Sequence, residues 1–451
     1  MGMRYRSTMG KDPLVDMKTM VFRGKPDDGG LYMPVEWESF SNEEIYRMRE
    51  MSVPEIGYEV GKKFFGKDLS DSVLQDIAEK ALTFGIPIEH VEDNIYIMRL
   101  DQGPMGAFKC FAAQYMGQTM RYYSQYLDKE MVIIIATSGD TGASVAKAFH
   151  NMPGFQVYVM YPKKEISRIQ AVLMDTLGGN VHARAVDAKF DPLQEYAQEL
   201  LKDPDLSDIS RNSANSIHLL RLLPQTIYHI FGSSRVRDGL YPVVKSDSCG
   251  NFGNMTADVI AMKYLGNPVG KIIVATNEND EFPVFMATGH YKPIKPSREC
   301  LSNAMNVGNP SNLRRVFDIY DGIVTADGDV RKMPYMDEMR KDLFAISISD
   351  GLTRKRIKQT WEDHRIPVEQ HGAVSLEAAF RYKNVTGDSR PILVTETAAP
   401  WKFTELLDEL GVGYDVPGWV DTIMKAPPKN KRELPGNYQA IKEDFRATFC
   451  Q

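Results

Sequence analysis

The chain has 451 residues, of which 43% are hydrophobic and 25% charged, and its formal net charge is −6. This composition is typical of a soluble globular protein with about two or three domains. The acidic balance gives no general attraction to nucleic acid or to an anionic membrane. No apolar run is long enough to span a membrane, and the first residues lack a signal-peptide pattern, so we expect a cytoplasmic protein that binds neither nucleic acid nor membrane.

The cysteines and histidines argue against a disulfide framework and a metal centre. The four cysteines, Cys110, Cys249, Cys300 and Cys450, lie far apart and form no CxxC pair, and the eight histidines are scattered. We therefore expect reduced thiols and no metal site.

The predicted elements alternate between helices and buried strands. Residues 1–95 carry short helical patterns rich in Met, Glu and Arg, and we expect a mostly helical N-terminal cap. Near-continuous apolar runs predict strands at 131–138, 155–162, 271–277 and 390–397. Helical patterns lie at 142–152, 191–203, 216–231 and 255–266. This alternation favours an α/β fold with mainly parallel sheets.

A polar loop follows the strand at 131–138. Its residues are Ser138, Gly139, Asp140, Thr141 and Gly142. Between a strand and a helix, such a loop presents backbone N–H groups and hydroxyls that suit a carboxylate or a phosphate. The alternative is a simple helix N-cap, because Ser, Asp and Thr all cap helices well.

A second, glycine-rich loop precedes the helix predicted at 255–266. Gly250 and Gly253 allow the amides between them to converge on a phosphate, and the helix adds its positive end. The loop is neither a Walker loop nor a GxGxxG loop, so ATP or a dinucleotide is not indicated. The alternative is an ordinary glycine turn.

Lys109 stands among small residues, in the sequence "GPMGAFKC" of residues 103–110. The ordinary reading is a solvated lysine on a helix face. A desolvated lysine has a lowered pKa and can form a Schiff base with an aldehyde cofactor. One cofactor uses a lysine, a phosphate cradle and a loop for a substrate carboxylate together, and that cofactor is pyridoxal 5'-phosphate.

Eight segments resemble, in order, motifs of the threonine synthase family, which are pyridoxal-phosphate enzymes of fold type II. They are "GKPDDGGLYMP", "GPMGAFKCFAAQ", "ATSGDTGASVA", "NSANSIHLLRLLPQ", "GNFGN", "AMNVGNPSNLRR", "VEQHGAVSLEAA" and "ETAAPWKF". The resemblance covers nearly the whole chain. It implies a fold like that of the tryptophan synthase β subunit, with two domains that each contain a parallel sheet. The implied division is an N-terminal domain at 1–95, a large cofactor domain at 96–130 and 236–425, a smaller mobile substrate domain at 131–235, and a surface tail at 426–451.

The resemblance also implies roles for individual residues. Lys109 would bind the cofactor and transfer protons. Further cofactor contacts would come from Asp140, Gly250, Asn251, Phe252, Gly253, Asn254 and Thr397. Substrate contacts would come from Ser138, Gly139, Thr141, Gly142, Asn215, Ser216 and Arg221. For Asn215, Ser216 and Arg221 the alternative is purely structural, as a helix start and a surface arginine.

The family's reaction converts O-phosphohomoserine and water to threonine and phosphate. Several motif positions depart from the family pattern: Met105, Cys110, Cys249, Asn306 and Ala399 stand where the family has Thr, Asp, Ser, Asp and His. A threonine synthase-like carbon–oxygen lyase is the first reading. The second is elimination or β/γ-replacement on another phosphorylated or activated amino acid. The third is a cofactor-binding protein without turnover, which the retained Lys109 disfavours. The sequence leaves monomer and homodimer equally open.

Overall fold

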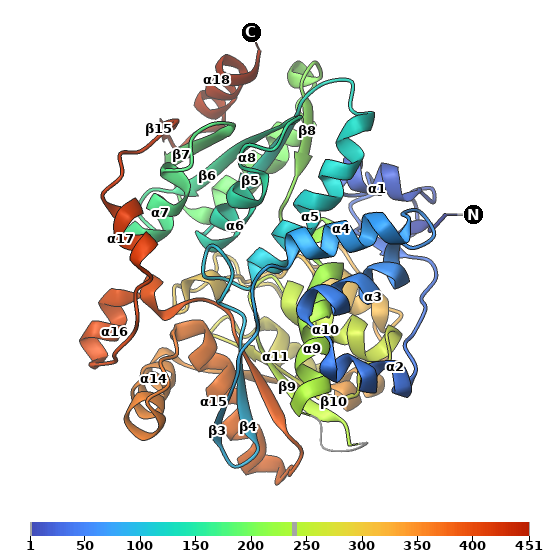
Figure 1. Ribbon diagram of the computed structural model, residues 1–451, viewed down its shortest axis with the longest axis vertical. Coiled ribbons are helices and arrows are strands. Elements are labelled where there is room, and N and C mark those ends of the chain that lie inside the picture. The colour runs from blue at the N-terminus through green and yellow to red at the C-terminus, as the bar shows by residue number, and fades with distance from the viewer. Residues whose placement is uncertain (1, 237–240, 451) are drawn as a thin grey trace.

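The computed structural model describes residues 2–236 and 241–450, and the chain there forms two large β-sheets, one in each lobe of the molecule (Figure 1). The larger sheet has the strand order β13-β10-β9-β14-β4-β3. In that order the strands are Leu343–Ser347, Val269–Thr276, Val243–Ser248, Ile392–Glu396, Ile95–Arg99 and Ile88–Glu92. All neighbours are parallel except β3 and β4, which pair antiparallel.

The smaller sheet is parallel throughout, with the order β15-β7-β6-β5-β8. Its strands are Lys431–Pro435, Val181–Asp187, Phe155–Pro162, Met131–Ala136 and Ser210–Ser213. Its helices are α6 (Asp140–Phe149), α7 (Arg168–Asp175), α8 (Phe190–Lys202) and α18 (Tyr438–Phe449).

Both faces of the smaller sheet are buried. Along β5, Val132 and Ile134 share a core cluster with Leu193 of α8 and Phe445 of α18. The alternate residues, including Ile133, belong to the main core cluster together with α6 and α7. Because successive side chains of a strand point to opposite faces, an unbroken apolar run is what a sheet covered on both faces requires.

Helices likewise cover the larger sheet. They are α9 (Thr226–Val236), α10 (Gly253–Tyr264), α14 (Asp350–His364) and α15 (Gln370–Thr386). The helix α5 (Lys109–Tyr123) packs against α6 of the smaller lobe instead. Ile272 and Val274 of β10 belong to the main core with α9 and α10, whereas the alternate Ile273 packs in a second cluster with α14 and α15. The remaining elements are α11 (Glu281–Thr288), α12 (Leu313–Ile319), β11 (Ile323–Val324), β12 (Val330–Lys332), α13 (Met336–Asp342), α16 (Thr404–Leu410) and α17 (Gly418–Met424).

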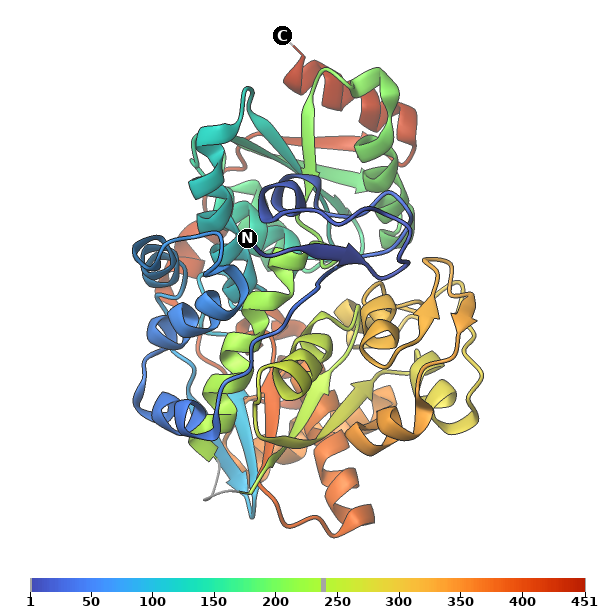
Figure 2. The ribbon, with the colours of Figure 1, turned by 90° about the vertical axis from the view of Figure 1, so that its right-hand side faces the viewer.

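The N-terminal region packs onto both lobes. Its elements are β1 (Tyr5–Ser7), α1 (Met17–Arg23), β2 (Tyr32–Pro34), α2 (Asn42–Arg47), α3 (Val53–Phe65) and α4 (Asp71–Ala81). A capping box of Ser52 and Glu55 starts α3. Figure 2 shows the first strand passing next to the segment around α12, where Arg6 and Asp318 form an ion pair of 2.6 Å.

The predicted α/β fold with parallel sheets is confirmed, and all four predicted strands are present as β5, β6, β10 and β14. The N-terminal region at 1–95 is mostly helical, as predicted. Its last residues include β3, which belongs to the larger sheet. The helix predicted at 216–231 is instead two 3₁₀ turns, Leu219–Arg221 and Leu223–Gln225, followed by α9. Pro224 has no N–H group to donate and so interrupts an α-helix there.

The prediction of a surface tail at 426–451 is wrong. β15 pairs in parallel with β7, and Ile441 and Phe445 of α18 are fully buried against the smaller sheet. The tail is therefore part of the smaller lobe.

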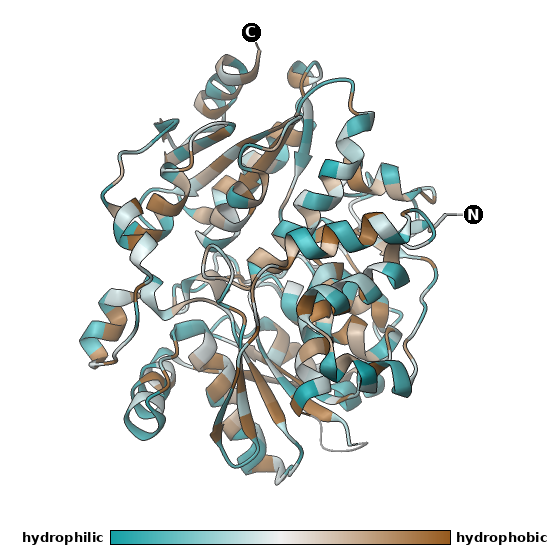
Figure 3. Ribbon diagram, in the orientation of Figure 1, coloured by the Kyte–Doolittle hydropathy of each residue, from teal (hydrophilic) through white to brown (hydrophobic). Residues whose placement is uncertain are grey.

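Among the described residues, the search for helices long and apolar enough to cross a membrane finds none. Hydrophobic residues concentrate in the strands at the centre of each lobe (Figure 3). Along the outer helices, hydrophobic and hydrophilic residues alternate.

Candidate active site

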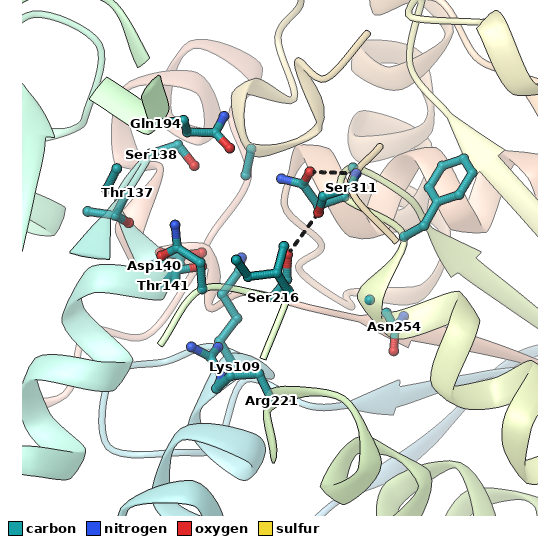
Figure 4. A pocket seen from close by; sticks show the side chains of 18 of the residues that line it. Lys109, Thr137, Ser138, Asp140, Thr141, Gln194, Ser216, Arg221, Asn254 and Ser311 are labelled. Atoms are coloured by element: carbon teal, nitrogen blue, oxygen red, sulfur yellow. Dashed lines mark hydrogen bonds between the residues drawn. The ribbon is translucent and has the colours of Figure 1, made fainter. Parts of the chain in front are cut away.

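A cavity of about 400 Å³ opens where loops from both sheets meet. Three loops that line it follow the carboxyl ends of β5, β9 and β14, which is where parallel α/β sheets place their ligands. Figure 4 shows Lys109 and Arg221 entering this cavity together, with Ser138, Asp140 and Thr141 on one side and Ser216 and Ser311 on another.

Lys109 is the first residue of α5 and lines the cavity. The preceding loop is fastened to the end of β14, because Phe108 N–H donates to the Thr397 carbonyl at 2.9 Å and Ala399 N–H donates to the Gly106 carbonyl at 2.9 Å. No hydrogen bond or ion pair of the Lys109 ammonium occurs within the described residues, and its Nζ lies 4.8 Å from the Phe108 ring centroid. The backbone next to Lys109 is therefore fixed, while its amino group is free to react.

The surroundings of Lys109 favour its neutral amine. Burial lowers the pKa of Lys109, the charge of Asp140 raises it, and the charges of Lys402 and Arg221 lower it further, with a net decrease. Its position at the positive end of a helix acts in the same direction. A neutral amine is the form that attacks a carbonyl carbon and accepts a proton.

Asp140 is held in a buried ion pair. Its Oδ1 lies 2.9 Å from Lys402 Nζ and also accepts a hydrogen bond of 2.9 Å from Gln170 Nε2. Burial alone would raise the pKa of Asp140, but the nearby charges of Lys402 and Lys109 and these hydrogen bonds hold it at about 2. This carboxylate stays charged next to Lys109. Lys109 therefore has a neighbouring negative charge even though Cys110 stands where the family has an aspartate.

The loop after β5 is ordered by its own residues. Thr137 Oγ1 accepts hydrogen bonds from Gly139 N–H at 2.9 Å and from Gly142 N–H at 2.8 Å. Ser138, Asp140 and Thr141 line the cavity, whereas Gly139 and Gly142 shape the turn and are not among the lining residues.

The loop from Gly250 to Asn254 forms a backbone cradle at the start of α10. A Cβ atom at Gly250 would lie 2.6 Å from the Ala304 carbonyl oxygen, so only glycine fits there. Phe252 adopts a left-handed conformation with φ of 61°, which turns the chain into the helix. Among the hydrogen bonds of the described residues, none is donated by the backbone N–H groups of this loop. Such free amides at a helix N-terminus fit a phosphate group.

A sealed group of titratable side chains lies behind this cradle. His229, Asp247 and Asp258 offer atoms that lie within 4.8 Å of one another, and Lys245 is buried next to them. Asn254 Nδ2 donates to Asp247 Oδ1 at 3.1 Å, which connects the group to the cradle. Its residues come from α9, β9 and α10, and no metal-binding spacing pattern marks them.

Asn215 and Ser216 line the cavity with Arg221. Arg221 is only 3% exposed, so the alternative of a surface arginine is wrong. Its Nη1 donates to the Ala214 carbonyl at 2.6 Å, and its buried Nε has no partner. Ser216 Oγ lies 3.3 Å from Ser311 Oγ.

The motif departures lie close around the lysine loop and the cradle. Cys110 Sγ contacts Ser144 Oγ at 3.5 Å, and Cys249 Sγ donates to the Asp247 carbonyl. Met105 is buried, and its carbonyl accepts a hydrogen bond from Lys402. Ala399 packs tightly on Gly106: a Cβ atom added at Gly106 would lie 2.9 Å from the Cβ atom of Ala399. Asn306 accepts a hydrogen bond from Asn277 at 2.9 Å. None of these five residues is among those that line the cavity.

Sequence reasoning missed several residues that line the cavity or support it. These are Lys25, Gln194, Gln198, Lys202, Ser311, Arg314, His371 and Lys402. Lys25, Ser311, Arg314, His371 and Lys402 all fall inside motifs quoted from the sequence, which was the available signal. The glutamines and Lys202 of α8 gave none.

A free lysine amine in one cavity with a backbone phosphate cradle, at the carboxyl ends of parallel strands, defines a pyridoxal-phosphate enzyme. The family model described as "Pyridoxal-phosphate dependent enzyme" matches residues 82–397, and "Threonine synthase N terminus" matches residues 4–82. The chain belongs to the threonine synthase family of pyridoxal-phosphate-dependent lyases.

Individual relatives match over nearly their full lengths. The threonine synthase of Escherichia coli is 31% identical over 432 residues, which cover 95% of this chain and 96% of that protein. That of Haemophilus influenzae is 33% identical over 416 residues, with 92% of each chain covered. The crystal structure of the E. coli threonine synthase matches with a TM-score of 0.88 at 30% identity, covering 99% of this chain and all of that one. A pyridoxal-phosphate-bound threonine synthase from Brucella melitensis matches with a TM-score of 0.91 at 25% identity, over the full length of both chains.

Proposed function

We propose that this protein converts O-phosphohomoserine and water to threonine and phosphate. The observation that carries the proposal is the unpaired amine of Lys109, which enters one cavity together with the 250–254 cradle, the loop after β5 and Arg221. Membership in the threonine synthase family supports this reaction.

The cradle residues Gly250, Asn251, Phe252, Gly253 and Asn254 would hold the phosphate of the cofactor. Thr397, whose Oγ1 lies 3.4 Å from Ser248 Oγ, would face the pyridine nitrogen. When bound, pyridoxal phosphate supplies an electron sink that makes the α- and β-carbons of an attached amino acid acidic.

Lys109 would move protons at those carbons. Its lowered pKa favours the neutral amine, which accepts a proton, and the resulting ammonium can return it. The charged pair of Asp140 and Lys402 stays next to the amine in both states. The Oδ1 atom of Asp140 already accepts hydrogen bonds from the side chains of Gln170 and Lys402. Asp140 would therefore act on the cofactor through its negative charge and its fixed position.

The substrate would lie between the two lobes. The hydroxyls of Ser138 and Thr141, at the N-terminal end of α6, suit its carboxylate. Asn215, Ser216 and Arg221 offer an amide, a hydroxyl and a guanidinium with an unpartnered Nε for its phosphorylated end. Gly139 and Gly142 support this site by shaping the turn. The smaller lobe, formed by residues 131–213 with the C-terminal strand and helix, would close over the substrate and exclude water.

A second candidate function is elimination or β/γ-replacement on a different phosphorylated or activated amino acid. Met105 and Ala399 favour it, because both place apolar groups against the lysine loop where the family pattern has polar ones. A binding protein without turnover is the least supported, since binding alone needs no free amine. We further propose a cytoplasmic protein, monomeric or homodimeric, in keeping with its four free cysteines.

Product analysis of the purified holoprotein tests these functions. Threonine and phosphate released in equal amounts from O-phosphohomoserine would support the first. Formation of 2-oxobutanoate, or turnover only of other phosphorylated amino acids, would replace it with the second. Lys109→Ala is the control, and it should abolish both turnover and the visible absorbance of the lysine-bound cofactor.

A further inference from the structure

The outer part of the cavity is lined by cations without carboxylate partners. Lys25 follows α1, Lys202 ends α8, and Arg314 belongs to α12. None of the three takes part in an ion pair within residues 2–236 and 241–450. Lys202 is exposed at the rim, and Lys25 and Arg314 are half-buried.

The fold holds Lys25 at this place. The Val21 carbonyl accepts hydrogen bonds from Asn212 Nδ2 at 2.9 Å and from His218 Nε2 at 3.0 Å, which docks the end of α1 on the smaller lobe. Gly24 then turns the chain with φ of 72°, and a Cβ there would lie 2.7 Å from Asn212 Oδ1. The Lys25 ammonium donates to Gln198 Oε1 of α8. An ammonium has three donors, so two remain for a ligand.

Arg314 is anchored on one side only. Its Nε donates to the Ser311 carbonyl at 3.2 Å and its Nη1 to the Gly29 carbonyl at 2.6 Å. Among the described residues, no hydrogen bond of its Nη2 occurs. Ser311 N–H donates to Asn251 Oδ1 at 3.2 Å, so the turn that carries Arg314 is joined to the phosphate cradle.

These cations repel one another in a partly desolvated place. Burial lowers the pKa of Lys25 to about 8, the charges of Lys202 and Arg314 lower it in the same direction, and the charge of Asp27 raises it. Burial lowers the pKa of Arg314 to about 10 against the opposing charge of Asp327. A bound anion would relieve this repulsion and take up the free donors.

We propose that Lys25 and Arg314 form a second anion subsite, separate from the 250–254 cradle, that binds a phosphate dianion. The inference rests on the proposed function, in which the phosphoryl group of the substrate and the released phosphate share this chemistry. The subsite would adjoin Ser216 and Arg221, since Ser216 Oγ lies 3.3 Å from Ser311 Oγ, and the Ser311 carbonyl accepts a hydrogen bond from Arg314. Two cations from different segments, one a planar guanidinium, suit a group with two charges and several acceptor oxygens. The N-terminal region thereby contributes directly to substrate recognition.

The test compares the holoenzyme with Lys25→Met and Arg314→Met. Lys355→Met is the matched control, because Lys355 is exposed on α14 and the substitution removes the same charge. One arm titrates inorganic phosphate into each holoprotein by calorimetry at constant ionic strength. The other arm measures KM and kcat for O-phosphohomoserine. Unchanged melting temperature and cofactor absorbance show that each variant is folded and loaded.

We expect about tenfold weaker binding of phosphate in both variants and none of this loss in Lys355→Met. A matching rise in KM with little change in kcat would show that the ester is held there as well. A rise in KM alone assigns the subsite to the substrate, and a loss of phosphate affinity alone assigns it to the product. If both quantities stay at the wild-type values, the subsite is disproved. If O-phosphohomoserine is not converted at all, the proposed function fails, and the phosphate arm by itself still decides the subsite.

Discussion

Lys402 Nζ lies 2.9 Å from Asp140 Oδ1, and this buried ion pair joins the segment after β14 in the larger lobe to the first residue of α6 in the smaller lobe. Lys402 also donates to the Met105 carbonyl at 3.3 Å, within the loop that carries Lys109. The pair therefore links three segments of the site. It also places opposite charges next to the Lys109 amine, whose pKa each of them shifts.

Lys402→Met should strongly destabilise the protein. The substitution leaves Asp140 charged and buried with only Gln170 as its side-chain partner, which costs about 3–5 kcal/mol for a buried pair. Calorimetric unfolding would show a lower melting temperature. The double variant Asp140→Asn/Lys402→Met removes both charges and should recover a large part of this loss. Equal melting temperatures for the single and double variants would contradict the coupling.

Gly250→Ala should weaken cofactor binding. The added Cβ would lie 2.6 Å from the Ala304 carbonyl oxygen, which belongs to the backbone, so the cradle must shift. We expect at least a tenfold higher dissociation constant for pyridoxal phosphate, measured by titrating the apoprotein. Gly351→Ala is the control, because a Cβ at Gly351 meets nothing within 4 Å. Equal affinities in the two variants would show that the cradle does not hold the phosphate.

Lys245→Met should reduce both stability and cofactor affinity. It leaves Asp247 and Asp258 buried without their common cation, and Asp247 holds Asn254 of the cradle. The further change Asp258→Asn removes the second buried carboxyl group and should restore part of both losses. Denaturant unfolding and cofactor titration measure them. A variant that loses stability but keeps wild-type cofactor affinity would show that the buried group does not act on the cradle.

His218 makes stability depend on pH below neutrality. Complete burial lowers the pKa of His218 to about 4, whereas an unfolded histidine titrates near 6.5. Between these values the unfolded chain binds a proton that the folded chain does not, so the free energy of unfolding falls as pH falls from about 6.5 to about 4. The loss amounts to about 3 kcal/mol.

Denaturant unfolding across this pH range tests the role of His218. His218→Asn should flatten the pH dependence by roughly that amount, whereas His290→Asn, at an exposed position, should leave it unchanged. The same slope in wild type and His218→Asn would assign the pH dependence to other groups.

Much of the fold could be predicted because the central strands, which are buried on both faces, appear in the sequence as unbroken apolar runs. β6 occupies the predicted range, and β5, β10 and β14 differ from it by a few residues, since strands covered on both faces consist of unbroken apolar residues. β15 could not be found in this way. Its sequence "KRELP" is largely charged, as is usual for an edge strand, and only its pairing with β7 reveals it.

The candidate site shows the same division. Lys109 and the 250–254 loop were visible because local chemistry marks them, with small residues around a lysine and glycines before a helix. The pairing of Lys402 with Asp140 joins residues 262 positions apart. No local pattern predicts such a contact, and the same holds for Lys25 with Arg314 and for the sealed group at Asp247.

The pairing of β15 with β7 has a consequence for how the protein is made. The smaller lobe takes its first strands from the middle of the chain and its last strand and helix from the end. During synthesis the edge of β7 that β15 will pair with is exposed, and the apolar surface that Ile441 and Phe445 will cover stays open, until residues 431–449 have been made. The larger lobe has all of its strands earlier. The nascent chain can therefore finish the cofactor-binding lobe first, and it remains prone to edge-to-edge association until α18 leaves the ribosome.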